Sequence, residues 1–142
     1  MPWRRRCAAH SGSSGARVTA DLQGASLLEA NLAGADLSAD MKNQSMGLMR
    51  ALLISAKLDR ANLSGANLSW VDLHFASLKG ADLTGTNMTA AQLAGADLTG
   101  ANVAGAIFTS ADVNSAQLYD LVAAAEAVDL EKARNLKRAF RN

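Results

Sequence analysis

Aspartates recur along this chain at a spacing that could suggest paired catalytic carboxylates. Asp72, Asp82, Asp97 and Asp112 each precede a large apolar residue in a repeating five-residue pattern. Paired carboxylates act as general acids and bases, but such chemistry also needs a concave site and a convergent base or nucleophile. His74 is the single histidine near them, and the pattern predicts that it faces outward. The residues therefore predict hydrogen-bonding aspartates on an outer surface, with no catalytic, cofactor-binding or metal site and no enzymatic activity.

Sulfur-containing side chains add little further chemistry. Cys7 is the only cysteine, so the chain can form no intramolecular disulfide and has no CxxC motif for metal or redox chemistry. Met41, Met46 and Met49 offer soft ligands for a metal ion, but methionine more often fills gaps in irregular packing. We expect a free thiol at Cys7 and packing roles for the three methionines.

The element that must position these side chains is a five-residue repeat. Between Ala56 and Asp120 it runs thirteen times without a gap, with leucine at the centre of nine units and alanine two residues earlier in eleven. A chain that returns a buried residue every five positions must turn once per unit, so four units close a square coil of twenty residues. The pattern predicts an all-β solenoid with a narrow, dry interior. It also predicts that Leu83→Asp abolishes folding and that Thr84→Asp is nearly silent.

Units such as ADLQG, ANLAG, ANLSG and ADLTG resemble the pentapeptide-repeat family, whose motif is A(D/N)LXX. The resemblance extends over residues 20–120. It implies a right-handed quadrilateral β-helix, including the handedness, which the period alone does not give. It implies little about function, since most members of the family have none assigned.

The chain divides into three segments. Residues 1–19 are basic and contain the run SGSSG, and we expect a disordered tail. Residues 20–120 form the β-helix, with a break of register near 40–45, because Lys42 stands where a buried leucine belongs. The later leucine centres are displaced by one residue, so either a bulge or a small loop absorbs the difference.

The last segment, residues 121–142, changes to a period of about 3.6 residues, which predicts an α-helix. Leu121, Val128, Leu136 and Phe140 lie on its apolar stripe, and acidic residues precede basic ones, the order that the helix dipole favours. We expect one helix, or two short ones, packed on the end of the rod. This helix would serve as an end cap or as the contact of a homodimer.

Stacking the units with a period of twenty gathers apolar and aromatic residues on one outer side of the rod. We name this side the aromatic face and define it by Arg50, Leu52, Ile54, Trp70, His74 and Phe75. Arg50 would lie beneath Trp70, where a cation–π pair could form. An exposed apolar patch usually marks a contact. Either the chain covers the patch itself, with the 40–45 insertion or the N-terminal tail, or another protein docks on it.

Charge and hydropathy narrow the class of partner. The net charge is +1, but residues 20–120 carry −5. A rod that mimics DNA, as in the gyrase-binding subgroup of the family, would need roughly one negative charge per 1.7 Å of its length. The net charge of residues 20–120 is far smaller than this density requires. No stretch approaches the roughly 18 apolar residues of a membrane span. No complete signal peptide is visible either, so a cytoplasmic location is favoured.

These observations predict a non-enzymatic, rigid rod that docks onto a partner protein or a larger complex. It would use no cofactor and make no direct contact with nucleic acid. The alternative is a DNA-mimicking modulator of DNA gyrase.

Overall fold

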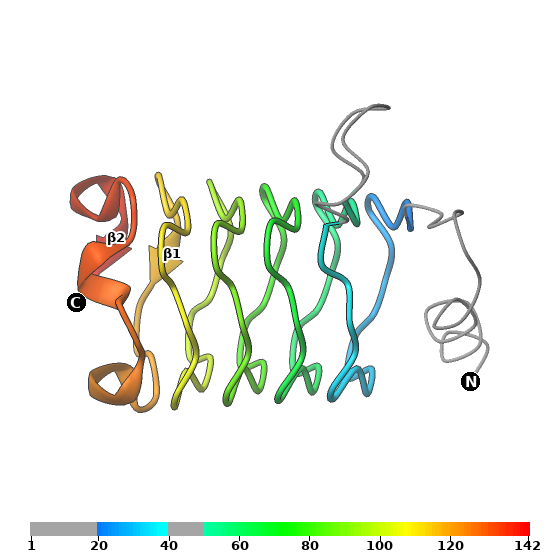
Figure 1. The fold of residues 1–142 in the computed structure, drawn as a ribbon, viewed down its shortest axis with the longest axis horizontal. Helices are drawn as coiled ribbons and strands as arrows, with labels where there is room; N and C mark the ends of the chain where they lie inside the picture. The colour runs from blue at the N-terminus through cyan, green and yellow to red at the C-terminus, as the bar shows by residue number, and fades with distance from the viewer. Residues whose placement is uncertain (1–19, 40–49) are drawn as a thin grey trace.

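The chain folds into a rod of stacked coils (Figure 1). The computed structural model describes residues 20–39 and 50–142. Successive coils pair in parallel along four sides, mostly through single bridges between residues twenty positions apart, as in Asp72 with Gln92. This arrangement confirms the four-sided solenoid that the five-residue period predicts.

Backbone hydrogen bonds run between coils, along the axis of the rod. Leu73 donates its N–H to the carbonyl of Gln92 at 2.8 Å, and Gln92 donates to the carbonyl of Val71 at 2.9 Å. Among residues 20–39 and 50–142, two consecutive residues pair only where β1 (Gln117–Leu118) meets β2 (Phe140–Arg141), again in parallel. Each coil thus satisfies the backbone of the one before it.

The core is a column of leucine and alanine side chains inside the rod. The central leucine and the alanine two positions before it are fully buried in the middle coils, as for Leu83 and Ala81. Thr86 replaces one of these alanines, and its buried hydroxyl donates to the carbonyl of Leu63 at 2.8 Å, so no polar group is left unsatisfied there. Each buried leucine contributes roughly 1.5–3 kcal/mol.

Corner residues with a left-handed backbone allow the chain to turn once per unit. Gly85 has φ +63°, a conformation that glycine adopts without strain. Trp70 and Phe75 occupy equivalent corners with φ 63° and 58°. The turn is closed by the next alanine, as where Ala76 donates its N–H to the carbonyl of Leu73 at 3.1 Å.

The break of register separates the first two described coils. Asp21 pairs with Leu52, 31 residues further along, whereas Leu52 pairs with Asp72 after 20. The eleven extra residues equal two repeats and one residue, which confirms the predicted displacement by one position. The break predicted near 40–45 and the tail predicted at 1–19 themselves lie outside the described residues.

The predicted C-terminal α-helix is wrong. Residues 121–142 form one more four-sided coil, which appears as the last turn of the rod in Figure 1. It contains three single turns of 3-10 helix: η2 (Ala124–Glu126), η3 (Leu130–Lys132) and η4 (Leu136–Arg138).

The sides of this last coil are six residues long instead of five. The residues that bridge to the preceding coil are Val122, Val128, Arg134 and Phe140. A residue with left-handed backbone precedes each 3-10 turn and interrupts any longer helix, as at Asp129 with φ 57°. The open edge of the preceding coil also offers backbone partners that an isolated helix could not use, and Val128 donates to the carbonyl of Ala106 at 2.8 Å.

Candidate interaction surface

The structure brings the six residues of the aromatic face together on one side of two adjacent coils. Leu52 and Asp72 are bridge partners on this side, and Arg50 enters it from the start of the lower coil. Leu52 and Ile54 are half-buried. Trp70 and Phe75 are exposed at the two corners that bound this side of the upper coil. The bridge between Leu52 and Asp72 has the spacing of twenty residues on which the grouping is based.

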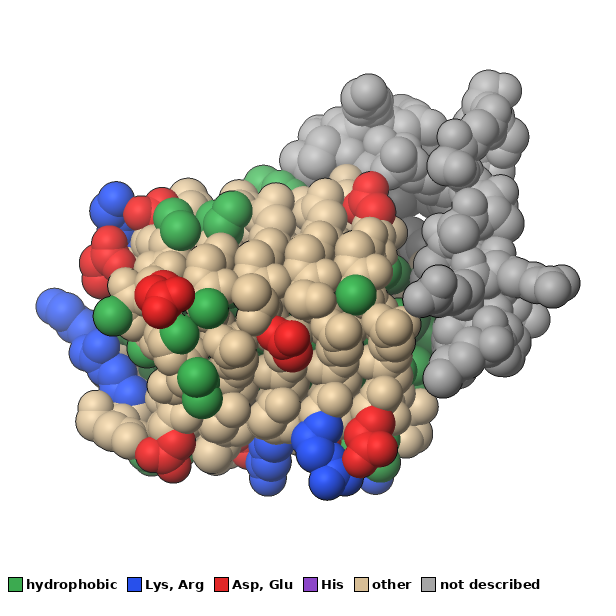
Figure 2. All heavy atoms as spheres, turned by 90° about the horizontal axis from the view of Figure 1, so that it is seen from below, with side chains coloured by type: hydrophobic (Ala, Val, Ile, Leu, Met, Phe, Trp, Pro, Cys, Tyr) green, Lys and Arg blue, Asp and Glu red, His purple; other side chains and the backbone are tan. Residues whose placement is uncertain are grey.

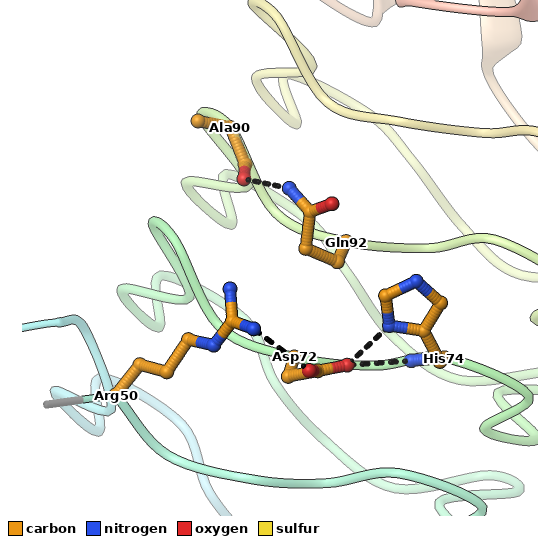
Figure 3. Close-up of polar contacts among 5 residues, drawn as sticks. All are labelled: Arg50, Asp72, His74, Ala90 and Gln92. Carbon is orange, nitrogen blue, oxygen red and sulfur yellow. Dashed lines mark hydrogen bonds and ion pairs between the residues drawn. The ribbon is translucent and has the colours of Figure 1, made fainter. Parts of the chain in front are cut away.

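A buried carboxylate, which the sequence did not single out for this role, organises the centre of the face. The side chain of Asp72 is only 7% exposed. Arg50 donates from Nη2 to its Oδ2 at 3.0 Å, and the Nδ1 of His74 contacts its Oδ1 (Figure 3). The backbone N–H of His74 also reaches Oδ1, at 3.3 Å. Because two side chains and a backbone group share this carboxylate, its buried charge is compensated.

Arg50 therefore pairs with Asp72 rather than with the ring of Trp70. The cation–π pair that the sequence suggested is replaced by this ion pair. One coil further on, Gln92 donates from Nε2 to the carbonyl of Ala90 at 3.0 Å (Figure 3). The face thus holds a fixed polar centre between two exposed aromatic corners.

The aspartates and asparagines that directly precede a central apolar residue follow a single rule, which explains why Asp72 and His74 meet. The residue before the central leucine accepts the backbone N–H of the residue after it, and also its hydroxyl where that residue is serine or threonine. Asp82, for example, accepts the N–H of Thr84 at 3.0 Å and its Oγ1–H at 2.6 Å. Asp72, Asp82, Asp97 and Asp112 thus make the hydrogen bonds that the sequence predicts for them.

Trp70 and Phe75 are unusual because large aromatic residues occupy strained positions. Trp70 is 37% exposed and Phe75 is 67% exposed, although a left-handed backbone costs a non-glycine residue roughly 1–2 kcal/mol. The ring of His74 lies 6.2 Å from that of Phe75, centroid to centroid. Phe75 also lies against the backbone of Gly95 in the next coil, where a Cβ atom would come within 2.5 Å of the ring.

Gly95 therefore controls the position of Phe75, and Gly95→Ala should displace the ring. We expect a loss of about 1–2 kcal/mol in the free energy of unfolding, from the left-handed backbone and from the clash. Gly85→Ala is the matched control, because Gly85 has a similar φ of +63° and open space around it. Urea unfolding measures both variants. In a Phe75→Ala background the cost of Gly95→Ala should fall to that of Gly85→Ala, and an unchanged cost would contradict the contact.

Two aspartates of the outer ladders have lowered pKa values. For Asp97, burial is the largest influence and raises the pKa, but hydrogen bonds from Thr99 and the ammonium group of Lys79 together lower it further. For Asp112, burial again raises the pKa, while hydrogen bonds from Asn135 and Asn114 outweigh it. Both carboxylates are thus stabilised in their charged form.

A carboxyl group whose pKa is lowered by folding stabilises the protein at any pH above its pKa in the unfolded state. This contribution is lost as the pH falls through its pKa in the folded state. We expect the free energy of unfolding to decrease as the pH is lowered from about 5 to below about 3.9. The decrease should be smaller in Asp97→Asn/Asp112→Asn. Urea unfolding across this pH range measures the slope, and a double variant with the wild-type slope would contradict the prediction.

The C-terminal residues predicted to form an apolar helix stripe are divided by the last coil. Leu121 and Leu136 pack toward the core, whereas Val128 and Phe140 face outward and are about half exposed. Leu130, which the helical stripe leaves out, also packs against the core, and Ala133, beside the stripe, is buried. The end of the rod carries a hollow of about 270 Å³, lined by Leu118, Asp120, Leu121, Ala124, Leu130, Leu136, Arg141 and Asn142.

The described residues contain neither a metal-binding cluster nor a membrane-spanning helix. Within residues 20–39 and 50–142, no group of three or more His, Cys, Asp or Glu side chains could hold a metal ion. The same part of the chain contains no helix with the length and apolar character needed to cross a bilayer.

Comparison with known proteins places these features in a family context. The sequence model described as Pentapeptide repeats matches eight copies in the chain, over residues 20–39, 48–85 and 86–120. The fold is similar to that of HetL, a pentapeptide repeat protein involved in heterocyst differentiation regulation from the cyanobacterium Nostoc sp. strain PCC 7120. The two chains share 30% identity with a TM-score of 0.69, over 84% of this chain and 48% of HetL.

A pentapeptide repeat protein from the thylakoid lumen of Arabidopsis thaliana is also similar in fold. It shares 21% identity with a TM-score of 0.51, over 80% of this chain and 61% of the plant protein. The chain thus spans about half the length of HetL and about three fifths of the plant protein. None of the curated proteins compared with the chain matches its sequence. The structural matches indicate that the solenoid is a right-handed β-helix.

Proposed function

The chain belongs to the pentapeptide-repeat family, and on this premise we propose that it is a non-catalytic rod that docks on a partner protein through the aromatic face. One observation carries the proposal: Trp70 and Phe75 are exposed at corners whose backbone disfavours large residues. Aromatic residues are the usual anchors of protein interfaces, and such a choice at a strained position favours a role outside folding. The likeness to HetL, which is involved in regulation of differentiation, supports a regulatory role exerted by binding.

The surroundings of the two rings suit a contact with another protein. Leu52 and Ile54 provide a half-buried apolar floor, and the Arg50–Asp72 pair leaves no uncompensated charge beneath it. An interface core with few free charges and polar groups at its edge is typical of protein–protein recognition. The rod also holds the face rigid, because every coil is bonded to its neighbours.

The test is a crosslinking experiment followed by a measured affinity. A photoreactive amino acid at position 75 would capture the partner, and Trp70→Ser/Phe75→Ser should then weaken binding of the purified partner more than tenfold. The tenfold loss corresponds to about 1.4 kcal/mol. Tyr119→Ser is the matched control, because Tyr119 is exposed to the same extent as Trp70 but lies on another side of the rod.

The double variant should keep the fold, since both side chains lie outside the core. An unchanged affinity in Trp70→Ser/Phe75→Ser, with thermal unfolding like the wild type, would overturn the proposal. Equal weakening by Tyr119→Ser would do so as well, because it would show that any exposed ring contributes.

A DNA-mimicking modulator of gyrase has less support in the charge distribution. Acidic side chains stand apart from one another on the side of the rod that Figure 2 shows, and Lys and Arg lie beside several of them. Glu29 pairs with Arg60 at 2.8 Å and Asp97 with Lys79 at 3.2 Å. Such pairs break up any continuous row of negative charge. A supercoiling assay with purified gyrase distinguishes the two functions, because inhibition would favour the mimic.

The sequence predicts a C-terminal helix as the contact of a homodimer. Because residues 121–142 form a coil instead, a contact between two copies would use the end of this last coil. Its end is hollowed and apolar, with Leu130 and Leu136 at the lining. Glu126 and Glu131 lie early in the coil and Lys137 and Arg138 late, so two ends could meet with opposite charges opposed. Sedimentation equilibrium over a wide range of concentration measures this association.

A further inference from the structure

At the other end of the rod, the first coil is paired on one side only among the described residues, and part of its apolar centre is exposed. In the first coil, residues 20–39, the central residues Leu22 and Leu32 are only partly buried, whereas Leu27 and Leu37 are buried. The corresponding Leu53 and Leu63 of the next coil are fully buried, because a coil lies on each side of them. A solenoid needs its terminal coil covered by polar or charged groups if its core is not to meet water.

The first coil is also acidic. It contains Asp21, Glu29 and Asp36 and no lysine or arginine. Arg60 of the next coil reaches Glu29, but the carboxylates of Asp21 and Asp36 accept only backbone N–H groups and a serine hydroxyl among the described residues. The end of the rod therefore presents negative charge around an apolar centre.

The chain supplies a segment of opposite character directly before this coil. Residues 1–19, which lie outside the described residues, contain Arg4, Arg5, Arg6 and Arg17 and no acidic residue. Trp3 precedes the arginine cluster. Nineteen residues can reach about 60 Å when extended, which is ample to cross the end of a coil whose sides are five residues long.

We propose that residues 1–19 dock on the open end of the first coil, with the arginine cluster against Asp21 and Asp36 and with Trp3 over the centre near Leu22 and Leu32. The charge complementarity of the two neighbouring segments carries the assignment, together with the incomplete burial of the first coil. The proposal is independent of the aromatic face, which lies on a side of the rod and not at its end.

Charge reversal in the full-length chain tests it. The three variants are Arg4→Glu/Arg5→Glu/Arg6→Glu, Asp21→Lys/Asp36→Lys, and their combination. The measurement is hydrogen exchange at the amides of Leu27 and Leu32, which are bonded to the next coil at 2.8 and 2.7 Å and are exposed when the first coil opens. Each reversal should speed exchange roughly threefold to tenfold, as the loss of a few exposed ion pairs implies, and the combination should restore protection.

A control separates the proposed contact from the loss of local hydrogen bonds. Asp82→Lys removes a carboxylate with the same local role from a middle coil, and combining it with the arginine reversal should restore nothing. Wild-type exchange in the arginine variant, or additive effects in the combination, would overturn the proposal. Protection that depends on protein concentration would also overturn it, because a second copy would then cover the end.

Tryptophan fluorescence gives a second measurement. The chain contains only Trp3 and Trp70, so Trp70→Phe leaves Trp3 as the sole reporter. We expect Trp3 to be shielded from acrylamide in this background and to become accessible when the three arginines are reversed or when salt is raised. Full accessibility of Trp3 in the unreversed chain would contradict the docking.

Discussion

Leu83→Asp should abolish folding. Leu83 is fully buried at the centre of a middle coil, between the core residues of the coils before and after it. An unpaired carboxylate there would lose its hydration and find no partner, at a cost of several kcal/mol. Native domains are stable by only about 5–15 kcal/mol, and a solenoid transmits the loss of one coil to its neighbours. Circular dichroism and size-exclusion chromatography would show an unfolded or aggregated chain.

The structure changes the control that the sequence suggests. Thr84→Asp, predicted from the sequence to be silent, would place a second carboxylate beside Asp82, which now accepts the hydroxyl of Thr84 at 2.6 Å. We expect it to cost about 1 kcal/mol. Ala104→Asp is the better control, because Ala104 occupies the equivalent outer position in the next coil, beside the uncharged Asn102. Urea unfolding of this variant should differ little from the wild type.

The outcome bears directly on which residues face inward. If Leu83→Asp folded as well as Ala104→Asp, the alternation between core and surface would be misassigned along the whole repeat. If both failed, the outer positions would have to be far more constrained than their exposure implies.

The regular part of the rod follows from the sequence because its rule is local and repeated. The period fixes both the coil and the side on which each residue lies, so the grouping of Trp70 and Phe75 with Leu52 could be foreseen. The pairing of Arg50 with Asp72 could not, since it depends on the rotamers of two side chains in neighbouring coils. The rule that joins positions before and after the leucine could have revealed the Asp72–His74 contact, because Asp82 and Thr84 show the same spacing.

The last coil was missed for a different reason. Its apolar residues fit a helical stripe in part. The sequence of this segment alone does not show that the preceding coil offers it unpaired backbone groups, such as the carbonyl of Ala106. The overlooked signal is a six-residue period in which alanine recurs at Ala127, Ala133 and Ala139, with leucine three positions after the first two. This period corresponds to the six-residue sides of the last coil. Tertiary pairing thus decides the structure where local propensity favours a helix.

Ala133→Asp and Val128→Asp distinguish the coil from the helix by stability. Ala133 is 7% exposed and packs against the core, so a carboxylate there is both buried and too large, and we expect a loss of about 3 kcal/mol or more. Val128 is 46% exposed, so Val128→Asp should cost less than about 1 kcal/mol. A helix packed through Val128 predicts the reverse order. Urea unfolding of the two variants measures the difference.

A large cost at Val128 with a small one at Ala133 would therefore overturn the coil. A larger cost for Ala133→Asp than for Val128→Asp would show that the end of the rod is built like its middle. In both, an alanine is buried and the bridge residue faces outward, although the sides of the last coil have six residues instead of five. In each of the three six-residue steps between bridge residues, the extra residue is absorbed by a turn of 3-10 helix, such as η3 between Asp129 and Ala133. The interior then retains its small residues while the perimeter widens, which accounts for the half-exposed Val122, Val128 and Phe140 on the outside of the last coil.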